Sequence, residues 1–300
     1  MNLQTIIVVQ KLDDPRSNAV NRVLHTIKLW CYAQDITLRY HQELQHPDVV
    51  RLDNVNNDIL VVAIGGDGTV IYAAEHYSYL NAPVMGFNLG KVGFLADFEP
   101  SRVIESLMAV QEGLLYTESR ATLHCEFFTT TNNVISTAEN QLMFSNVNAL
   151  NDVVISGTES DTTLTYDMYI DNMFAGTHSA NGVIVSTPTG STAYALSAGG
   201  SIIMPNMEVL QVVAIAPMTL TSRPIVIPKE HGIRICFSVT PNKPVTIRVD
   251  GNKIHTFSVD TIEESFNATV HVLMSPTKVN LIHHHTWNHF DILKQKLGWA

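Results

Sequence analysis

The sequence is poor in cysteine and in positive charge, and each shortage excludes a class of protein. Its 300 residues include three cysteines, Cys31, Cys125 and Cys236, which lie far apart and form no C-x-x-C pair. A disulfide framework or a cysteine-ligated zinc site is therefore not expected, and the cysteine content is typical of a reducing compartment. Lys and Arg number 18 against 28 Asp and Glu, which gives a formal net charge of −10. A broad basic surface for nucleic acid or for an anionic membrane is therefore not expected.

Long apolar runs are lacking as well. Ile59–Ile64 is the longest run of note, far shorter than the roughly 20 residues that a membrane-spanning helix requires. The N-terminal MNLQTIIVVQKLDD has no basic segment ahead of its short apolar run. We therefore predict a cytoplasmic protein with neither membrane nor nucleic acid as a partner. An acidic protein can still bind phosphates through backbone N–H groups, a few basic side chains or a metal ion.

Strand and helix patterns alternate through the first third of the chain. Thr5–Val9 and Ile59–Ile64 are continuous apolar runs, typical of strands that are buried on both faces. Ser17 and Asn18, both good N-caps, precede apolar residues at helical spacing. The order strand–helix–strand predicts a parallel sheet with right-handed crossovers. The other elements predicted here are a tight turn at Gly65–Thr69, a helix at Val70–Tyr77, a strand at Pro83–Phe87 and a helix at about Ser101–Glu112, ended by Gly113.

The pattern changes to a period of two after about residue 115. Apolar and polar residues alternate over residues 121–127, and Asp250-Gly251 lies between two apolar segments as a strong hairpin signal. We predict an α/β N-terminal domain with a parallel sheet over residues 1–114, followed by a β-rich, antiparallel, sandwich-like domain over residues 115–282, an α+β protein overall. A last helix at about Thr286–Leu297, within a C-terminal segment of about residues 283–300, is expected to pack back onto the first domain.

The first segment with a chemical interpretation is Gly65-Gly66-Asp67-Gly68-Thr69, which follows a predicted buried strand and precedes a predicted helix. Ligands bind at this place in an open α/β sheet. Glycines let the backbone approach a phosphate closely, and the helix N-terminus offers unpaired N–H groups. An Asp is unfavourable beside an anion, so we interpret Asp67 as a base for a hydroxyl nucleophile, as in phosphoryl transfer generally. The alternative is a plain strand-to-helix turn that uses Gly and Asp for their backbone preferences.

Two further segments carry polar groups that suit a nucleotide. Gly182–Gly200 runs from an apolar strand into a loop rich in hydroxyls and small residues, with one aromatic face, Tyr194. Asn151-Asp152 precedes another apolar strand, where a carboxylate can accept hydrogen bonds from a ribose diol and an amide can read the edge of adenine. Each segment alone also fits a simpler alternative, a Ser/Thr-rich loop or a turn before a strand.

In this order, the three segments resemble the NAD kinase family in its bacterial branch, and the resemblance extends over nearly the whole chain. Asn88–Asp97 is similar to the family's stretch G-x-x-G-x-L-G-F-L-x-D, and Ser222–Val226 and Lys296–Trp299 are similar as well. The resemblance implies the NAD kinase fold, with an active site in the crevice between the two domains. It also implies NAD and ATP (or polyphosphate) as substrates, a divalent metal ion, with Mg²⁺ foremost, and a homo-oligomer, either dimer or tetramer.

The resemblance also assigns roles by position. Asp67 would accept the proton of the 2′-hydroxyl of the adenosine ribose, which attacks the γ-phosphate of ATP in line. Asn151 and Asp152 would hold the adenosine part of NAD. No metal ligands are assigned. The substrate-binding positions are Gly68, Phe94, Asn151, Asp152, Asn181, Thr189, Thr192, Ala193, Tyr194, Ser197 and Asn252, and the candidates on the ATP side are Gly65, Gly66, Thr69 and Arg223.

Two positions depart from the family's pattern. Asn181 stands where many members have Asp before the glycine that opens the hydroxyl-rich loop, and Ser179 stands where proteobacterial relatives often have Arg. Both positions face the nicotinamide end of the dinucleotide in the family. The preference for NAD over NADH is therefore expected to be weak.

Two other functions share parts of the pattern. A lipid kinase of the diacylglycerol or sphingosine type has the same G-G-D-G-T turn, but it needs an apolar entrance for acyl chains. This chain has hydroxyls and the Asn151-Asp152 pair instead. A sensor that holds the dinucleotide without turnover would have no need of Asp67.

Histidines gather near the end of the chain, at His283–His285 and His289. No carboxylate or cysteine stands at a set spacing from them, which argues against a metal site. We predict a solvated surface cluster.

Overall fold

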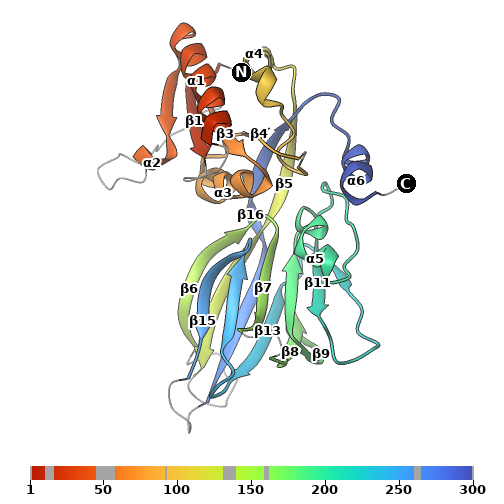
Figure 1. The fold of residues 1–300 in the computed structure, drawn as a ribbon. Coiled ribbons are helices and arrows are strands. Elements are labelled where there is room, and N and C mark those ends of the chain that lie inside the picture. The colour runs from red at the N-terminus through yellow and green to blue at the C-terminus, as the bar shows by residue number, and fades with distance from the viewer. Residues whose placement is uncertain are drawn as a thin grey trace. The chain divides into compact units, whose positions relative to one another are not determined.

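The computed structural model describes residues 2–10, 17–44, 58–91, 93–130, 140–158, 162–259 and 265–298, so that Val92 and Trp299 lie outside the described residues. The chain divides into two compact units, Met1–Arg120 with Thr277–Ala300, and Ala121–Pro276 (Figure 1). The sequence-based prediction put the corresponding borders at 114/115 and 282/283. The chain passes from one unit to the other within β5 (Tyr116–Thr130) and within β16 (Phe266–His283).

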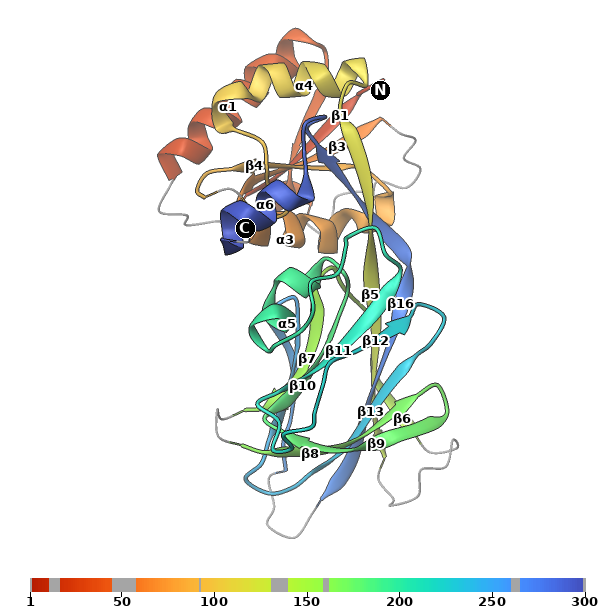
Figure 2. The ribbon, with the colours of Figure 1, turned by 90° about the vertical axis from the view of Figure 1, so that its right-hand side faces the viewer.

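The first unit is built on a parallel sheet with helices on both faces (Figure 2). α1 (Ser17–Ala33) and α4 (Val103–Glu112) cover one face, and α3 (Asp67–Tyr77) covers the other. The strands follow the order β2 (Thr37–Tyr40), β1 (Thr5–Gln10), β3 (Ile59–Gly65), β4 (Val84–Asn88) and the C-terminal end of β16. The shorter elements are α2 (His41–Leu44), η1 (Ser78–Leu80), η2 (Pro100–Arg102) and α6 (His289–Leu297).

The apolar runs of β1 and β3 explain why this sheet is covered on both faces. Every residue of β3 is buried, which requires a layer of side chains on each side of the strand. On one side, Val23 and Ile27 of α1 belong to the same core cluster as Leu60. On the other side, a Cβ added to Gly86 would lie 2.7 Å from Cγ2 of Val70, so α3 packs closely against β4.

Several boundaries differ from the predicted ones. α3 begins at Asp67, because the end of the glycine-rich turn forms the first turn of the helix, whereas the prediction began at Val70. α6 begins at His289, capped by the Asn288 side chain, and not at about Thr286. β2 and α2 were not predicted. β2 lies at the sheet edge with exposed and half-buried residues only, so it lacks the apolar run that marks its neighbours.

The second unit packs two sheets of strands face to face. In one sheet β16, β13, β8 and β9 are neighbours and β5 pairs with β6 and β16; the other follows the order β12-β11-β10-β7-β14-β15 and is antiparallel throughout. The bounds are β6 (Asn140–Ala149), β7 (Asp152–Gly157), β8 (Leu164–Ile170), β9 (Met173–Ala180), β10 (Gly182–Ser186), β11 (Val209–Ile215), β12 (Ile225–Pro228), β13 (Ile233–Val239), β14 (Val245–Val249) and β15 (Asn252–Phe257), with η3 (Gly190–Thr192) and α5 (Tyr194–Ser197) after β10.

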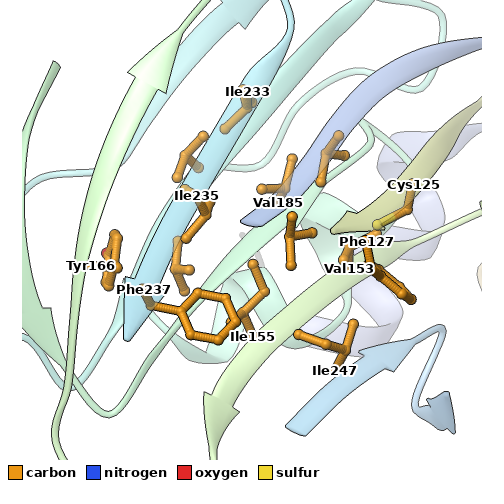
Figure 3. Packing of buried hydrophobic residues seen from close by; sticks show 14 of the residues in the cluster. Cys125, Phe127, Val153, Ile155, Tyr166, Val185, Ile233, Ile235, Phe237 and Ile247 are labelled. Carbon is orange, nitrogen blue, oxygen red and sulfur yellow. The ribbon is translucent and has the colours of Figure 1, made fainter. Parts of the chain in front are cut away.

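The core of this unit lies between the two sheets (Figure 3). Ile235 and Phe237 of β13 face Ile155 of β7 and Ile247 of β14. Cys125 is completely buried in the same cluster, and all three cysteines are free thiols. The alternating pattern of β5, β8 and β13 is the sequence trace of this two-sided arrangement. The predicted fold class, α/β followed by a β-rich part, is confirmed.

Within the described residues, no helix has the length and apolar character needed to cross a membrane.

Candidate active site

The glycine-rich turn joins β3 directly to α3 in the first unit. A Cβ on Gly65 would lie 2.1 Å from Oγ1 of Thr69, so only glycine fits there. At Gly66 and Gly68 an added Cβ would meet nothing within 4 Å. The backbone at these two positions is therefore open to a ligand, at the helix end where N–H groups favour an anion.

The carboxylate of Asp67 is held by a second segment of the same unit. Phe94 N donates to Oδ2 at 2.8 Å, while Leu95 N and Ala96 N both donate to Oδ1 at 3.0 Å. A Cβ on Gly93 would lie 1.8 Å from Oδ1, so the glycine allows this close approach. A carboxylate offers about four lone-pair positions. The three bonds within the described residues leave one position on Oδ2 for a further donor, such as a substrate hydroxyl.

The loop that holds Asp67 is itself supported from two sides. Nδ2 of Asn88 donates to the carbonyls of Lys91 (2.6 Å) and Ala96 (3.1 Å). The ring of Phe94, which is half-buried, lies 6.2 Å from the ring of His289 at the start of α6. The glycine-rich turn and the Asn88–Asp97 stretch, separate motifs in the sequence, thus form one structural unit around Asp67.

Three segments that are distant in sequence meet in the second unit: Leu150–Asp152, Thr187–Gly190 and Asp250. We call them the three-segment cluster. Asp250 accepts hydrogen bonds from the backbone N–H groups of Leu150 (2.7 Å), Asn151 (2.7 Å) and Asp152 (3.1 Å). Thr187 donates two hydrogen bonds to the same segment. Its Oγ1 donates to Leu150 O at 2.6 Å, and its backbone N–H donates to Asn151 O at 2.9 Å. A Cβ on Gly190 would lie 2.1 Å from Asn151 O, so only glycine fits where this loop approaches the backbone of Asn151.

Asp152 is the ionisable group with the most unusual environment in this cluster. Asp152 is 4% exposed. Burial raises its pKa to about 7, and the negative charge of Asp250 adds to the effect. No hydrogen bond joins its carboxylate to another group in the described part of the chain. A buried carboxylate in this state costs stability, and strongly shifted acids of this kind cluster at functional sites.

The hydroxyl-rich loop uses part of its hydroxyls to hold its own shape. Thr187 and Ser191 are completely buried. Oγ of Ser191 donates to Pro188 O at 2.6 Å and accepts from Ile203 N at 3.0 Å. The predicted ligand-facing positions that keep exposed surface are Thr192, Ala193, Tyr194 and Ser197, whereas Thr189 is buried.

The remaining predicted site residues lie at the edges of the second unit's strands. Asn181 is half-buried directly before β10. Its backbone N–H donates to Ile215 O, and its carbonyl accepts from Gly157 N. Asn252 is exposed at the start of β15. Arg223 is exposed between β11 and β12, where Nη1 donates to the carbonyls of Leu220 (2.8 Å) and Ser222 (2.7 Å).

The prediction of a solvated histidine cluster is wrong for two of its four members. His283 is completely buried and His289 is 6% exposed. Nδ1 of His283 lies 3.1 Å from Oδ2 of Asp97, and Nε2 lies 3.5 Å from Oε2 of Glu118. Burial lowers the pKa of His283, but the hydrogen bond to Asp97 and the nearby Glu118 carboxylate outweigh it, and the net pKa lies above its usual value. Charged neighbours thus make burial of an imidazole possible. Among the described residues no group of three or more side chains could hold a metal ion.

Known families match segments of both units. The family model described as ATP-NAD kinase N-terminal domain matches residues 16–115, and the one described as ATP-NAD kinase C-terminal domain matches residues 150–284. The chain belongs to the NAD kinase family. An NAD kinase of Photobacterium profundum is 34% identical over 241 residues, 80% of this chain and 76% of the relative. An NAD kinase of Shewanella oneidensis is 33% identical over 300 residues, 99% of this chain and 97% of the relative.

Solved structures from the NAD kinase family share the fold. Yeast NADH kinase complexed with NADH superimposes with a TM-score of 0.78 at 24% identity, covering 100% of this chain and 88% of that one. An NAD kinase from Archaeoglobus fulgidus in complex with ATP gives 0.69 at 21% identity, covering 98% and 99%. The predicted family and enzyme class, a kinase that phosphorylates NAD, are confirmed. The lipid kinase and the non-catalytic sensor are not favoured.

Proposed function

We propose that this member of the NAD kinase family transfers the γ-phosphoryl group of ATP to the 2′-hydroxyl of the adenosine ribose of NAD, giving NADP, with Asp67 as the proton acceptor. The observation that carries the proposal is the Asp67 carboxylate. Three backbone N–H groups fix it at the start of α3, and Oδ2 keeps one lone-pair position among the described residues. A ribose hydroxyl is a poor nucleophile at neutral pH, and a positioned base contributes about 10²–10⁴-fold.

The other groups of the site would bind and orient the substrates. Asp152 would accept hydrogen bonds from a ribose and Asn151 would read the adenine, with residues 192–197 lining the same pocket. The open backbone at Gly66 and Gly68 would approach the phosphates of ATP. Holding hydroxyl and phosphate in line reduces the barrier further through positioning and through N–H groups that stabilise the developing charge.

We also propose a divalent metal ion, Mg²⁺ foremost. Mg²⁺ keeps several waters and is usually bound by one or two carboxylates together with substrate phosphates. Within the described residues no group of three or more side chains could hold a metal ion. The ion would therefore be bound mainly by the phosphates of ATP and by water, and the free lone-pair position of Asp67 would remain available to the ribose hydroxyl. When bound, the ion would neutralise charge on the triphosphate.

A homo-oligomer and a cytoplasmic location remain proposals that rest on the resemblance to the family. The exposed apolar side chains of Phe174 (59% exposed) and Leu220 (92% exposed) in the second unit support the former, since a subunit interface would cover such groups. The mass of the purified protein in solution, measured by light scattering, tests it. A monomer at micromolar concentration would contradict it.

A coupled assay tests the activity itself. The purified protein is incubated with NAD, ATP and Mg²⁺, and NADP is detected with a dehydrogenase that uses only NADP. We expect NADP to form at a rate proportional to enzyme. Phosphorylation of diacylglycerol or sphingosine without NADP would indicate the lipid kinase, and NAD binding without turnover would indicate the sensor.

Preference between NAD and NADH should depend on Asn181. The nicotinamide ring is cationic in NAD⁺ and neutral in NADH, so a carboxylate nearby favours the oxidised form. Two charges about 4 Å apart interact by about 1 kcal/mol in water and about 4 kcal/mol at an effective dielectric constant of 20. Residue 181 is an uncharged amide and residue 179 is a serine instead of an arginine, so the wild type should accept both NAD⁺ and NADH. Asn181→Asp should shift the ratio of kcat/KM toward NAD⁺ by about tenfold.

Asn172→Asp is the matched control for this change in charge. Asn172 is an exposed amide in the β8–β9 turn of the same unit. Its variant carries the same added charge and should leave the ratio unchanged. An unmoved ratio in Asn181→Asp, or an equal movement in both variants, would show that residue 181 does not sense the charge of the ring.

A further inference from the structure

Asp250 was predicted only as part of a hairpin turn, and the turn does not explain why the residue carries a charge. Asp250 and Gly251 have φ angles of 49° and 81° between β14 and β15. Two-residue hairpin turns with positive φ at both positions favour Asn-Gly as strongly as Asp-Gly. The turn therefore explains a short polar residue at 250, and it does not explain why that residue carries a charge.

The backbone of Leu150–Asp152 explains the charge. Three consecutive N–H groups converge on the one carboxylate, two of them at 2.7 Å and one at 3.1 Å. Leu150 is 3% exposed, so its N–H group has no access to bulk water and needs an acceptor inside the protein. The Asp250 carboxylate is that acceptor, and the amide of an Asn would offer a donor to one of the three groups instead.

The same contact has a cost that a purely structural turn would avoid. It brings a second negative charge to Asp152, which is already buried, and like charges disfavour ionisation of their neighbour. On the other side of the segment, Thr187–Gly190 contains no ionisable side chain to compensate. A neutral acceptor at position 250 would relieve this repulsion. The carboxylate therefore lowers local stability while it holds the backbone of Asn151 and Asp152 in place.

We propose that Asp250 is the positioning residue of the NAD site: its carboxylate fixes the backbone of residues 150–152 so that the side chains of Asn151 and Asp152 meet the adenosine of NAD. The proposal rests on the proposed function, because it takes NAD as the ligand. Thr187 completes the arrangement from the opposite side by bonding the carbonyls of Leu150 and Asn151. Asp250 itself touches no substrate.

Two properties of Asp152 then depend on Asp250, its position and its charge. Burial and the Asp250 charge together raise the pKa of Asp152 to about 7. The ionised carboxylate is the stronger acceptor for a ribose hydroxyl. NAD affinity should therefore increase as pH rises from about 6 to 8 in the wild type, with a midpoint set partly by Asp250.

Asp250→Asn tests the proposal, since it keeps the preferred turn sequence and removes the charge. NAD binding is measured by calorimetry from pH 5.5 to 8.5, together with kcat and KM at each pH. We expect the dissociation constant for NAD at pH 7 to rise by about 10- to 100-fold, kcat at saturating NAD to change little, and the midpoint of the pH profile to move to lower pH. The shift of the midpoint reports the removed charge. A loss of NAD affinity that persists at pH 8.5, where Asp152 is ionised in both proteins, reports the positioning role.

Asp250→Gly is the second variant, because Gly-Gly also suits the turn and removes the carboxylate without adding a donor. Asp171→Asn is the matched control. Asp171 has a φ of 53° in the β8–β9 turn, and its Oδ1 accepts from Gly232 N at 2.9 Å. It undergoes the same chemical change in another two-residue turn between neighbouring strands, one with positive φ at its first residue, away from the three-segment cluster. It should leave NAD affinity and the midpoint unchanged.

The outcomes separate this proposal from the proposed function. If the wild type forms NADP and both Asp250 variants bind NAD with unchanged affinity and midpoint, the positioning role is wrong while the kinase activity stands. Equal weakening in Asp171→Asn would also overturn it, since general loosening of the unit would then explain the effect. If the wild type neither binds nor phosphorylates NAD, the proposed function fails, and this proposal fails with it.

Discussion

Asp67→Asn is expected to lower kcat by about 10²–10⁴-fold while NAD still binds. The amide keeps the size of the side chain but cannot accept the proton of the ribose hydroxyl. The coupled assay gives kcat, and calorimetry gives the NAD affinity. The structure adds a complication, because the same carboxylate accepts three backbone N–H groups of residues 94–96. An amide would present its NH₂ group to one of these donors.

Asn88→Ala separates the loss of the base from loosening of the loop. Asn88 holds the same loop through Lys91 O and Ala96 O and leaves the Asp67 carboxylate unchanged. The variant removes three neutral hydrogen bonds of the loop, since Oδ1 of Asn88 also accepts from Gly90 N at 2.8 Å. We expect it to lose about tenfold or less in kcat, because it removes no group that would accept the proton. A near-normal kcat in Asp67→Asn would remove Asp67 as the base. Equal losses in the two variants would assign Asp67 a structural role instead.

Asp152→Asn is expected to weaken NAD binding and to stabilise the fold, two effects of opposite sign. Loss of the charged acceptor should weaken NAD binding by roughly 1.5–3 kcal/mol. In the folded protein the pKa of Asp152 is raised from 3.8 to about 7. Between these two values the folded state keeps a proton that the unfolded state releases, so the free energy of unfolding falls as pH rises through this window.

The stability effect is large enough to measure. At about 1.4 kcal/mol for each pH unit between the folded and unfolded pKa, it amounts to on the order of 4 kcal/mol above pH 7. Asp152→Asn should therefore unfold at higher denaturant than the wild type at pH 8 and should show little difference near pH 4. Asp171→Asn provides the control for an exposed aspartate. Because Asp171 pairs with His231 and accepts from Gly232 N, this variant should lose stability at pH 8 and not gain it. If wild-type stability stays constant from pH 4 to 8, Asp152 is ionised without penalty, and its proposed environment is wrong.

Local features of this chain could be predicted because their cause lies in neighbouring residues. Gly113 ends α4 with a positive φ of 69°, and Asp250-Gly251 forms the expected hairpin, since both conformations depend on the residue itself. The buried runs of β1 and β3 and the period-two segments of the second unit reflect which faces are covered. The fold class follows from these patterns. β2 was missed because an exposed edge strand leaves no such pattern.

The candidate site could be predicted only in part. The sequence by itself selected the segments that we propose carry the chemistry, because the glycine-rich turn, the Asn151-Asp152 pair and the hydroxyl-rich loop have compositions that few structural roles require. Only the tertiary structure decided what each side chain binds. Asp67 meets N–H groups 27 to 29 positions away, Asp250 meets groups 98 to 100 positions away, and His283 is buried against Asp97, 186 positions away. Such partners depend on strand pairing and burial across the whole unit. The spacing of residues in a chain carries no record of them, because a carboxylate or an imidazole has the same local preferences whether it faces water, a backbone N–H group or a substrate.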